Sequence, residues 1–391
     1  MKSTTLFCAV TIACGSMACD PTTPVDPPVG NSNKIITQNI TANTTWYADT
    51  VYQLGGRIAV VDGVTLTIEP GTVIKGEAGT GANATALLIA RGGKLIAEGT
   101  ASAPIIFTTV ADEITPELVQ MGHLESPNLD PTVQGLWGGV IVLGRAPISA
   151  SNSTGDKSEV QIEGIPTSDA NGLYGGTIAE DNSGILRYVS IRHGGTNIGS
   201  GNEINGLTLG GVGSGTTIEH IEVVSNQDDG IEWFGGTVNV QNVVVWNVGD
   251  DAIDTDQSWG GTLDNFILIT PTGHCFELDG PEGTMSASHT IKNGTIYASN
   301  DEVTSGDLIN TDANSLVSLE SLYFTAIKPG QIINRLDAPG VFYSDIVLNV
   351  DTVSNYLMNG GSHPGITAGF SPKANTSVFG WTWAATAGMI P

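Results

Sequence analysis

The chain has 391 residues, a formal net charge of −26 and 51 glycines. A surface this acidic repels nucleic acid and anionic lipid headgroups, so we expect neither as a partner. Glycine is nearly twice as frequent as in average proteins but lacks the regular spacing of collagen, which indicates many turns.

The N-terminus has the layout of a bacterial secretory signal. Lys2 precedes an apolar run that is too short to span a membrane, and Ser16-Met-Ala-Cys19 resembles a lipobox, whose cysteine becomes the lipidated first residue. We therefore predict a lipoprotein signal peptide over residues 1–18 and lipidation of Cys19, with plain secretion as the alternative. The prolines of residues 19–34 predict an extended tether that follows the anchor.

These features predict an exported protein, anchored by lipid in the outer membrane or at the cell surface of a Gram-negative bacterium. Of four cysteines, three lie within or at the end of the predicted signal, which leaves Cys275. A single thiol cannot form an intrachain disulfide, and the neighbouring Phe276 predicts that Cys275 is buried. We expect a monomer that is stabilised by its core and touches the membrane through the anchor alone.

From about residue 35 the chain alternates short strands with Gly-rich or Pro-containing turns. Apolar residues recur at every second position, which indicates strands with one face inward and one face in water. Irregular stretches near 110–134 and 151–182 predict two insertions that lie over one side of the body. The predicted early strands are Ile35–Ile40, Arg57–Val61, Val64–Ile68, Ala86–Ala90, Lys94–Ala97 and Ile105–Thr109.

Three later segments share nearly the same sequence and establish a repeat. The apolar residues Ile231, Ile253 and Phe276 are 22 and 23 positions apart, a period typical of solenoids. Residues one period apart then lie about 4.8 Å from each other on adjacent coils. The repeating segments are Ile221–Glu232, Val243–Asp254 and Phe266–Glu277.

The repeat predicts a right-handed parallel β-helix, with the hand that crossover connections usually take. We predict one β-helix domain over residues 35–391, closed at its end by an atypical C-terminal cap around Phe379-Gly-Trp-Thr-Trp383. The predicted columns are an apolar one (Leu207, Ile231, Ile253, Phe276, Ile309 and Ile332), a polar one (Asp229, Asp251 and His274) and an acidic one (Glu232, Asp254 and Glu277).

Motifs spread over most of the chain resemble a widespread family of secreted or lipid-anchored bacterial β-helix proteins, common in Bacteroidetes and some Proteobacteria. The resemblance implies an all-β, pectin-lyase-like solenoid and an exported address, but no settled activity. The motifs are Val73-Ile-Lys-Gly, Gly135-Leu-Trp-Gly-Gly, Arg187-Tyr-Val-Ser-Ile-Arg-His-Gly-Gly, Asp229-Gly-Ile-Glu-Trp-Phe-Gly-Gly and Gly380-Trp-Thr-Trp.

A narrower resemblance, to polygalacturonase-type glycoside hydrolases, concerns the polar column. Gln227-Asp-Asp229, Gly249-Asp-Asp251 and Gly273-His-Cys275 look like the Asn-Thr-Asp, Gly-Asp-Asp and Gly-His-Gly motifs of those enzymes. The resemblance implies that Asp251 protonates the leaving oxygen and that Asp229 and Asp250 activate water, as in an inverting glycosidase. It also implies that His274 holds a hydrogen bond beside them.

The departures from that enzyme pattern argue against acidic substrates. Gln227 and Cys275 replace an Asn and a Gly, and Asn310-Thr-Asp312 stands where the enzymes carry the Arg-x-Lys that holds a substrate carboxylate. Asp and Gly also suit the tight turn before a strand, where Asp accepts backbone amides, so turn capping remains an alternative for the aspartates.

The same coils offer candidate ligand-binding and metal-binding residues. Aromatic faces beside carboxylates are common in sugar recognition, although an aromatic residue before Gly-Gly, as at Trp259, also packs a turn. Arg192 and His193 border the acidic columns in this scheme, with a structural ion pair as the alternative. The candidate ligand-binding residues are Trp233, Trp246, Trp259, Arg192 and His193, and the residues that would suit Ca²⁺ are Glu232, Asp254, Asp256, Glu277 and Asp279.

Three functions remain open from the sequence. The first is a surface lipoprotein that presents an acidic and aromatic strip to a glycan, with Ca²⁺ as the one cofactor that the residues suggest. The second is a hydrolase of a neutral or modified polysaccharide, which we prefer to a polysaccharide lyase if the chain is an enzyme. The third is a structural or adhesive surface module.

The predicted anchor is tested by metabolic labelling with a fatty-acid analogue. We expect label in the wild-type protein and none in Cys19→Ala, because the thiol of Cys19 is the acceptor. Thr11-Ile-Ala-Cys14 is a competing lipobox that would leave a very short signal, so Cys14→Ala is the control and should be labelled like the wild type. Label that persists in Cys19→Ala would contradict the assignment.

Overall fold

The computed structural model describes residues 32–198 and 204–390. The predicted signal peptide 1–18, Cys19 and most of the tether lie outside the described residues. Within the described ranges, no helix has the length and apolar content needed to cross a membrane.

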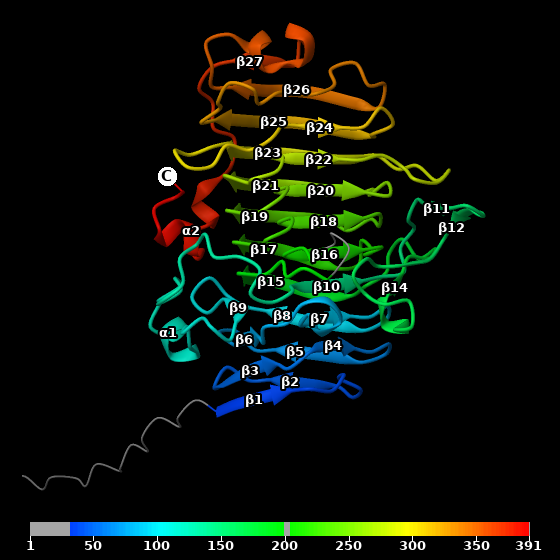
Figure 1. The fold of residues 1–391 in the computed structure, drawn as a ribbon, viewed down its shortest axis with the longest axis vertical. Coiled ribbons are helices and arrows are strands. Elements are labelled where there is room, and N and C mark those ends of the chain that lie inside the picture. Colours follow the sequence, from blue (N-terminus) through cyan, green and yellow to red (C-terminus); the bar gives the residue numbers. More distant parts are fainter. Residues whose placement is uncertain (1–31, 199–203, 391) are drawn as a thin grey trace, which may run out of the picture. The chain divides into compact units, whose positions relative to one another are not determined.

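Those residues form the predicted right-handed parallel β-helix, whose coils stack along one axis (Figure 1). A 15-stranded parallel sheet, sheet A, consists of β1 (Ser32–Ile36), β2 (Thr44–Trp46), β3 (Thr50–Leu54), β5 (Thr65–Ile68), β6 (Val73–Gly76), β8 (Lys94–Glu98), β9 (Ile105–Thr109), β15 (Gly184–Arg192), β17 (Thr217–Val224), β19 (Val240–Trp246), β21 (Thr262–Ile269), β23 (His289–Tyr297), β25 (Val317–Thr325), β26 (Val341–Leu348) and β27 (Ile366–Ala368).

An eight-stranded parallel sheet, sheet B, completes each coil. Its strands are β4 (Arg57–Val60), β7 (Ala86–Ile89), β10 (Val140–Leu143), β16 (Leu207–Gly210), β18 (Ile231–Phe234), β20 (Ile253–Asp256), β22 (Phe276–Leu278) and β24 (Asn310–Thr311). The remaining strands form two short hairpins, β11 (Ala150–Asn152) with β12 (Gly155–Lys157) and β13 (Val160–Gln161) with β14 (Leu173–Tyr174). The α-helices are α1 (Pro116–Gln120) and α2 (Trp383–Thr386), and the 3-10 helices are η1 (Gly81–Asn83), η2 (Ala170–Gly172), η3 (Val353–Tyr356), η4 (Met358–Gly360) and η5 (Thr376–Val378).

The register of sheet B confirms the predicted repeat. Neighbours in the apolar column are Ile231 with Ile253 and Ile253 with Phe276, and neighbours in the acidic column are Glu232 with Asp254 and Asp254 with Glu277. The apolar column continues through Ile309 to Ile333, which is fully buried. The predicted Ile332 is wrong by one position, and because neighbouring residues of a strand face opposite sides, that shift exchanges inside for outside.

Each long strand of sheet A bends at one residue in the left-handed region, which gives every coil an extra corner. The backbone φ of His220 is 55° and that of Asn242 is 59°, and the pairing of β17 with β19 skips both positions. Asn265 continues this column on the next coil and donates from Nδ2 to Asn242 Oδ1 at 2.7 Å. Asn tolerates this conformation better than most residues, so the amide column both permits and links the bends.

The two insertions cover different surfaces, so the prediction that they lie over one side of the body is wrong. The first, residues 110–139, carries α1 and packs Ile114 and Val119 on the outer face of sheet A. The second, residues 144–183, packs Ile148, Ile162 and Tyr174 on the outer face of sheet B, over the apolar side chains of β7 and β10. Sheet B therefore has an outer face that is apolar and covered in its earlier coils and polar in its later ones.

The C-terminal segment differs from the predicted cap, because it runs back along the solenoid. Phe379 and Trp383 pack on Val244, Trp246 and Ile267, on the outer face of sheet A. Helix α2 consequently lies beside the middle coils (Figure 1). The outer face of these strands carries apolar side chains that would contact water without the tail. The aromatic residues of the tail bury them, which explains why the tail lies there.

A buried ion pair fixes this tail. Glu222 Oε1 accepts the backbone N–H of Ala384 at 2.9 Å, and its Oε2 accepts from Ser190 Oγ at 2.6 Å and lies 3.6 Å from Arg192 Nη2. The Arg192 guanidinium carbon stands 5.1 Å from the ring centroid of Trp383. Glu222 is 0% exposed and Arg192 is 1% exposed, so each charge depends on the other.

Replacement of Glu222 by Ala should destabilise the fold by about 3 to 5 kcal/mol, because it leaves the Arg192 charge buried without a partner. Urea denaturation followed by tryptophan fluorescence measures the loss. Glu98→Gln is the matched control: it breaks the exposed pair with Arg187 and should cost under about 1 kcal/mol. Equal losses in the two variants would show that the buried pair has no special role.

Candidate functional site

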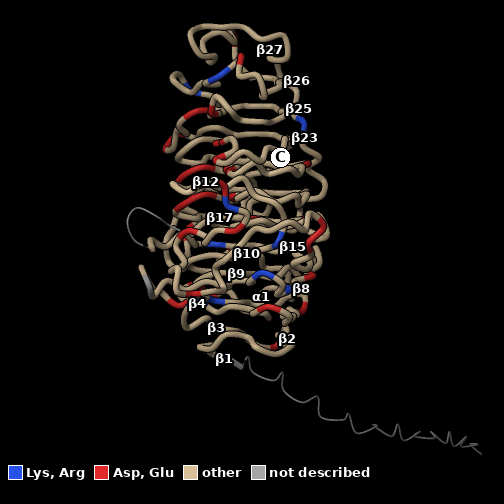
Figure 2. Tube along the Cα trace, turned by 90° about the vertical axis from the view of Figure 1, so that its right-hand side faces the viewer, with Lys and Arg blue, Asp and Glu red and all other residues tan. Residues whose placement is uncertain are grey.

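The polar part of the outer face of sheet B follows the later coils. Its half-buried outward residues form what we call the polar strip: Asp256, Glu277, Asp279, Asn310 and Asn334. Glu277 pairs in register with Asn310, and Asn334 Nδ2 donates to Asn310 Oδ1. Figure 2 shows that acidic residues recur on successive coils along one side of the solenoid.

The aspartates of the predicted polar column cap turns. Asp229 Oδ1 accepts the backbone N–H of Asp251 at 2.9 Å, and Asp251 Oδ1 accepts the backbone N–H of His274 on the following coil. Asp229 is 6% exposed and Asp251 is 2% exposed. The turn-capping alternative therefore describes both residues, because each carboxylate satisfies an amide one coil ahead.

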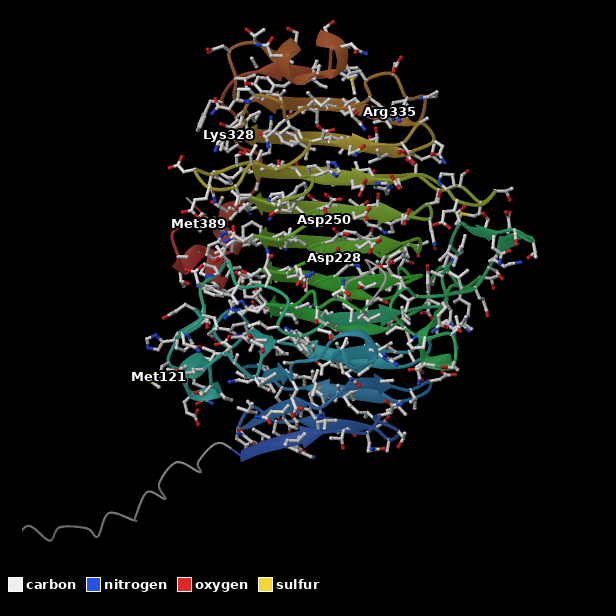
Figure 3. The ribbon with its side chains drawn as sticks, in the orientation of Figure 1. Met121, Asp228, Asp250, Lys328, Arg335 and Met389 are labelled. Atoms are coloured by element: carbon white, nitrogen blue, oxygen red, sulfur yellow. The ribbon has the colours of Figure 1, made fainter. Side chains whose placement is uncertain are left out.

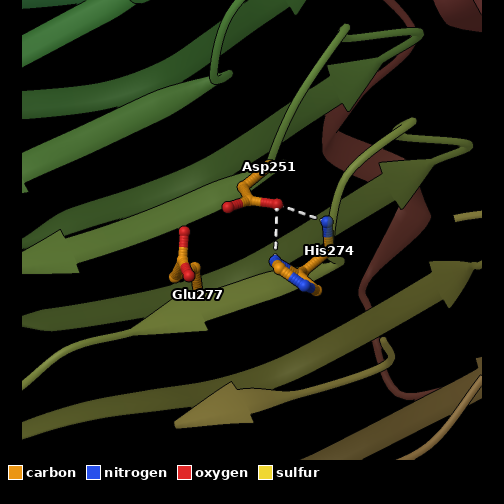
Figure 4. Close-up of side chains that lie close together, drawn as sticks. All are labelled: Asp251, His274 and Glu277. Carbon is orange, nitrogen blue, oxygen red and sulfur yellow. Dashed lines mark hydrogen bonds and ion pairs between the residues drawn. The ribbon is translucent and has the colours of Figure 1, made fainter. Parts of the chain in front are cut away.

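Asp251, His274 and Glu277 form a polar cluster that is partly accessible, through His274 and Glu277 (Figure 4). His274 Nδ1 lies 3.0 Å from Asp251 Oδ1, and this contact raises the pKa of His274 to about 9. Burial acts to raise the pKa of Asp251, but hydrogen bonds with His274 and Glu277 outweigh it and lower that pKa. Burial and the hydrogen bond with Asp251 raise the pKa of Glu277 to about 8.

These protonation states reverse the roles that the glycosidase resemblance implies. At neutral pH Asp251 is an anion paired with the His274 cation, so it is not the acid that would protonate a leaving oxygen. The buried Asp229 has a pKa well above its ordinary value, mainly from burial and then from nearby carboxylates, so it is not a ready base. Asp250 is exposed, and it and Asp228 lie on neighbouring coils (Figure 3).

The structure corrects the predicted ligand-binding set, because all five of its side chains are buried. Trp233 and Trp259 stack on each other inside the helix with ring centroids 4.6 Å apart. Trp246 is covered by the C-terminal tail. Arg192 and His193 lie beneath that tail and the first insertion, and His193 Nδ1 contacts the carbonyl of Val133 at 2.6 Å. None of the five therefore presents a face to a glycan.

The predicted metal ligands divide between two clusters. Glu232 and Asp254 lie with Asp229, and Glu277 lies with Asp251 and His274; in each cluster the candidate ligand atoms are within 4.8 Å of one another. Asp256 and Asp279 belong to neither, and burial followed by nearby carboxylates raises the pKa of Asp256 to about 7.

Sequence reasoning missed two amides that the structure places beside these groups. Asn205, just before β16, donates from Nδ2 to Glu232 Oε2, and Asn310 Nδ2 lies 3.3 Å from His274 Nε2. Asn310 could have been found from its place in the acidic column. Asn205 could have been found from the polar column, because it lies two residues before Leu207, as Asp229 lies two residues before Ile231. The buried Cys275 was predicted correctly, and burial raises the pKa of its thiol to about 12.

A family described as "Pectate-lyase like beta helix domain" matches residues 38–328. The chain belongs to this pectate-lyase-like β-helix family. The match covers most of the described coils, including every strand of sheet B. Neither the curated proteins nor the solved structures contain a match to the chain. Family membership therefore supports the β-helix and leaves the choice of ligand to the site itself.

The His274 contact predicts a pH-dependent stability for this β-helix. Because the pKa of His274 rises from 6.5 unfolded to about 9 folded, its contribution is fully present below pH 6.5 and is lost as the pH rises through 9. His274→Gln should therefore lower stability by about 1 to 2 kcal/mol near pH 6 and hardly at all near pH 9.5. Urea midpoints at both pH values measure this. The exposed His123, replaced by Gln, is the control, and a deficit of His274→Gln that does not change with pH would contradict the charge argument.

Proposed function

We propose that the chain is a carbohydrate-binding protein of the cell surface, and that its ligand is a neutral glycan that lies along the polar strip. The observation that carries the proposal is the strip itself. Asp256, Glu277, Asp279, Asn310 and Asn334 are half-buried, so they are partly fixed before a ligand arrives. Carboxylates and amides held in this way suit the hydroxyl groups of a sugar, and little side-chain entropy is lost on binding.

The direction of the strip supports an elongated ligand. Its members come from successive coils, which are spaced by about 4.8 Å. A polymer that follows the solenoid axis would meet at least one new polar group of the strip on each coil. The strip favours neutral sugars, because none of its five members is a cation that could pair with a uronate, and those of its carboxyl groups that are ionised would repel a pectin-like chain.

A raised border beside the strip supports binding on this face. Gln257 Nε2 donates to Glu282 Oε1 at 3.3 Å, and the backbone N–H of Glu282 donates to the carbonyl of Ser149 in the second insertion at 3.1 Å. Behind this border lies a pocket of about 440 Å³ whose lining includes Ile148 and Met285. The second insertion thus forms a wall along one edge of this face of sheet B.

The predicted signal and lipidation at Cys19 support the surface location. The prolines of the tether would hold the β-helix away from the membrane, with the strip open to extracellular polysaccharide.

Hydrolysis is the second candidate, because one accessible carboxyl group lies against a second, buried one. Glu277 is half-buried and shares a hydrogen bond with Asp251. Two neighbouring carboxyl groups are the usual requirement of glycosidase chemistry. The two candidates differ in outcome, since a hydrolase releases new reducing ends and a binding protein does not.

A panel of neutral polysaccharides, with polygalacturonate as the acidic comparison, tests the proposal. We expect wild-type binding to a neutral glycan and at least about tenfold weaker binding by Glu277→Gln/Asn310→Ala, because two hydrogen bonds of about 1 kcal/mol each are lost. The control, Glu320→Gln/Gln241→Ala, makes matched changes on sheet A and should bind like the wild type.

Three outcomes of the panel decide between the candidates. Reducing-end release that Glu277→Gln abolishes would establish the hydrolase. Equal loss of glycan affinity in the two double variants would show that the ligand does not bind at the polar strip. Binding to polygalacturonate alone would overturn the neutral class.

A further inference from the structure

Three carboxylates meet beside the polar strip, where the half-buried Asp254 is the in-register neighbour of Glu277. Asp229 precedes β18, Glu232 lies on β18 and Asp254 on β20, and their candidate ligand oxygens are all within 4.8 Å of one another. Asp229 and Glu232 are each 6% exposed. We call these three residues the buried triad.

The charge of the buried triad is poorly compensated by the residues that the structure describes. Asp229 accepts one backbone amide, from Asp251, and Glu232 accepts the side-chain amide of Asn205. In the described ranges, no Lys, Arg or His forms an ion pair with any of the three. Burial and then repulsion by neighbouring carboxylates raise the pKa of each carboxyl well above its ordinary value. Three such groups require protons or a cation.

Two orphaned oxygens at the buried triad point to a ligand. Asp254 Oδ1 is inaccessible to solvent and has no hydrogen-bond partner. Asn205 is 1% exposed, and its Oδ1 is likewise buried and unpartnered, although the same amide group contacts Glu232 through Nδ2. Buried polar oxygens are rarely left unsatisfied, so each marks a place for a donor or a cation. A cation would satisfy the Asp254 oxygen directly, and it would satisfy the Asn205 oxygen once that amide turns toward Glu232.

We propose that the buried triad binds a divalent cation, Ca²⁺, with the amide oxygen of Asn205 as a fourth protein ligand. All four donors are hard oxygens, which Ca²⁺ prefers, and its flexible coordination suits ligands on different coils better than the strict octahedron of Mg²⁺. Asn205 reaches the ion by turning its amide so that Oδ1 replaces Nδ2. The ion would link the turn before β16 to β18 and β20, and so join three consecutive coils.

Calcium binding is tested on the purified full-length chain by thermal unfolding with excess Ca²⁺ against excess chelator at equal ionic strength. We expect Ca²⁺ to raise the Tm by at least about 3 °C, because it binds the folded chain alone. Mg²⁺ should give a smaller shift. Tb³⁺ luminescence excited through Trp233 reports occupancy directly, since Trp233 adjoins Glu232 in the chain.

The variants separate a bound cation from protonated carboxyls. Glu232→Gln and Asp254→Asn should lose both the Ca²⁺ shift and the Tb³⁺ signal, yet in chelator they should be as stable as the wild type, because a neutral amide relieves the repulsion. Glu302→Gln removes one charge from an exposed loop and should keep both responses. A wild type that shows neither response, or a Glu232→Gln that keeps both, would overturn the site, and equal shifts with Mg²⁺ and Ca²⁺ would overturn the choice of ion.

The calcium site and the glycan site can fail separately. Glu277→Gln/Asn310→Ala leaves the buried triad intact, so its Ca²⁺ shift should equal that of the wild type even where its glycan binding is lost.

Discussion

Parallel stacking of coils at one strand spacing is the constraint on which the rest of this molecule depends. Because every coil repeats the path of the one before, a side chain meets its equivalent on the next coil. An apolar residue at an inward position thereby extends a core, as from Ile231 to Phe276. The same rule brings like charges together, so an acidic position becomes a column of repulsion unless the fold compensates it.

This chain compensates its acidic columns in several ways. The carboxylates of Asp229 and Asp251 accept amides from the following coil, and the imidazole of His274 supplies a positive charge. Glu277 lies at the more open end and keeps its proton. The mixture explains why neighbouring carboxyls of similar sequence context differ so widely in pKa, since each is set by burial and by its partner on the adjacent coil.

Most of the fold, but only part of the candidate site, could be predicted from the sequence. The period placed Glu232, Asp254 and Glu277 in one column, because local spacing decides which residues stack. Alternation within β18 places Trp233 on the inward face together with Ile231. The prediction that Trp233 is exposed to a glycan did not take this alternation into account. The covering of Trp246 depends on a segment distant in sequence, and single-sequence periodicity does not describe such a contact. Asn205 lies in the phase of the polar column, two residues before Leu207, and was overlooked. The sequence showed that the C-terminal aromatic residues depart from the repeat, but it did not predict that they pack on sheet A.

The returning tail alters how this solenoid holds together as a whole. In a simple repeat array each coil contacts only its neighbours, so unfolding can begin at either end and spread one unit at a time. Here Ala384 contacts Glu222, a residue 162 positions earlier, across several intervening coils. The middle of the solenoid is therefore complete only when the last residues of the chain have been made and have docked. A domain built from local contacts thus acquires one long-range closure, which slows its folding and couples the coils into a single cooperative unit.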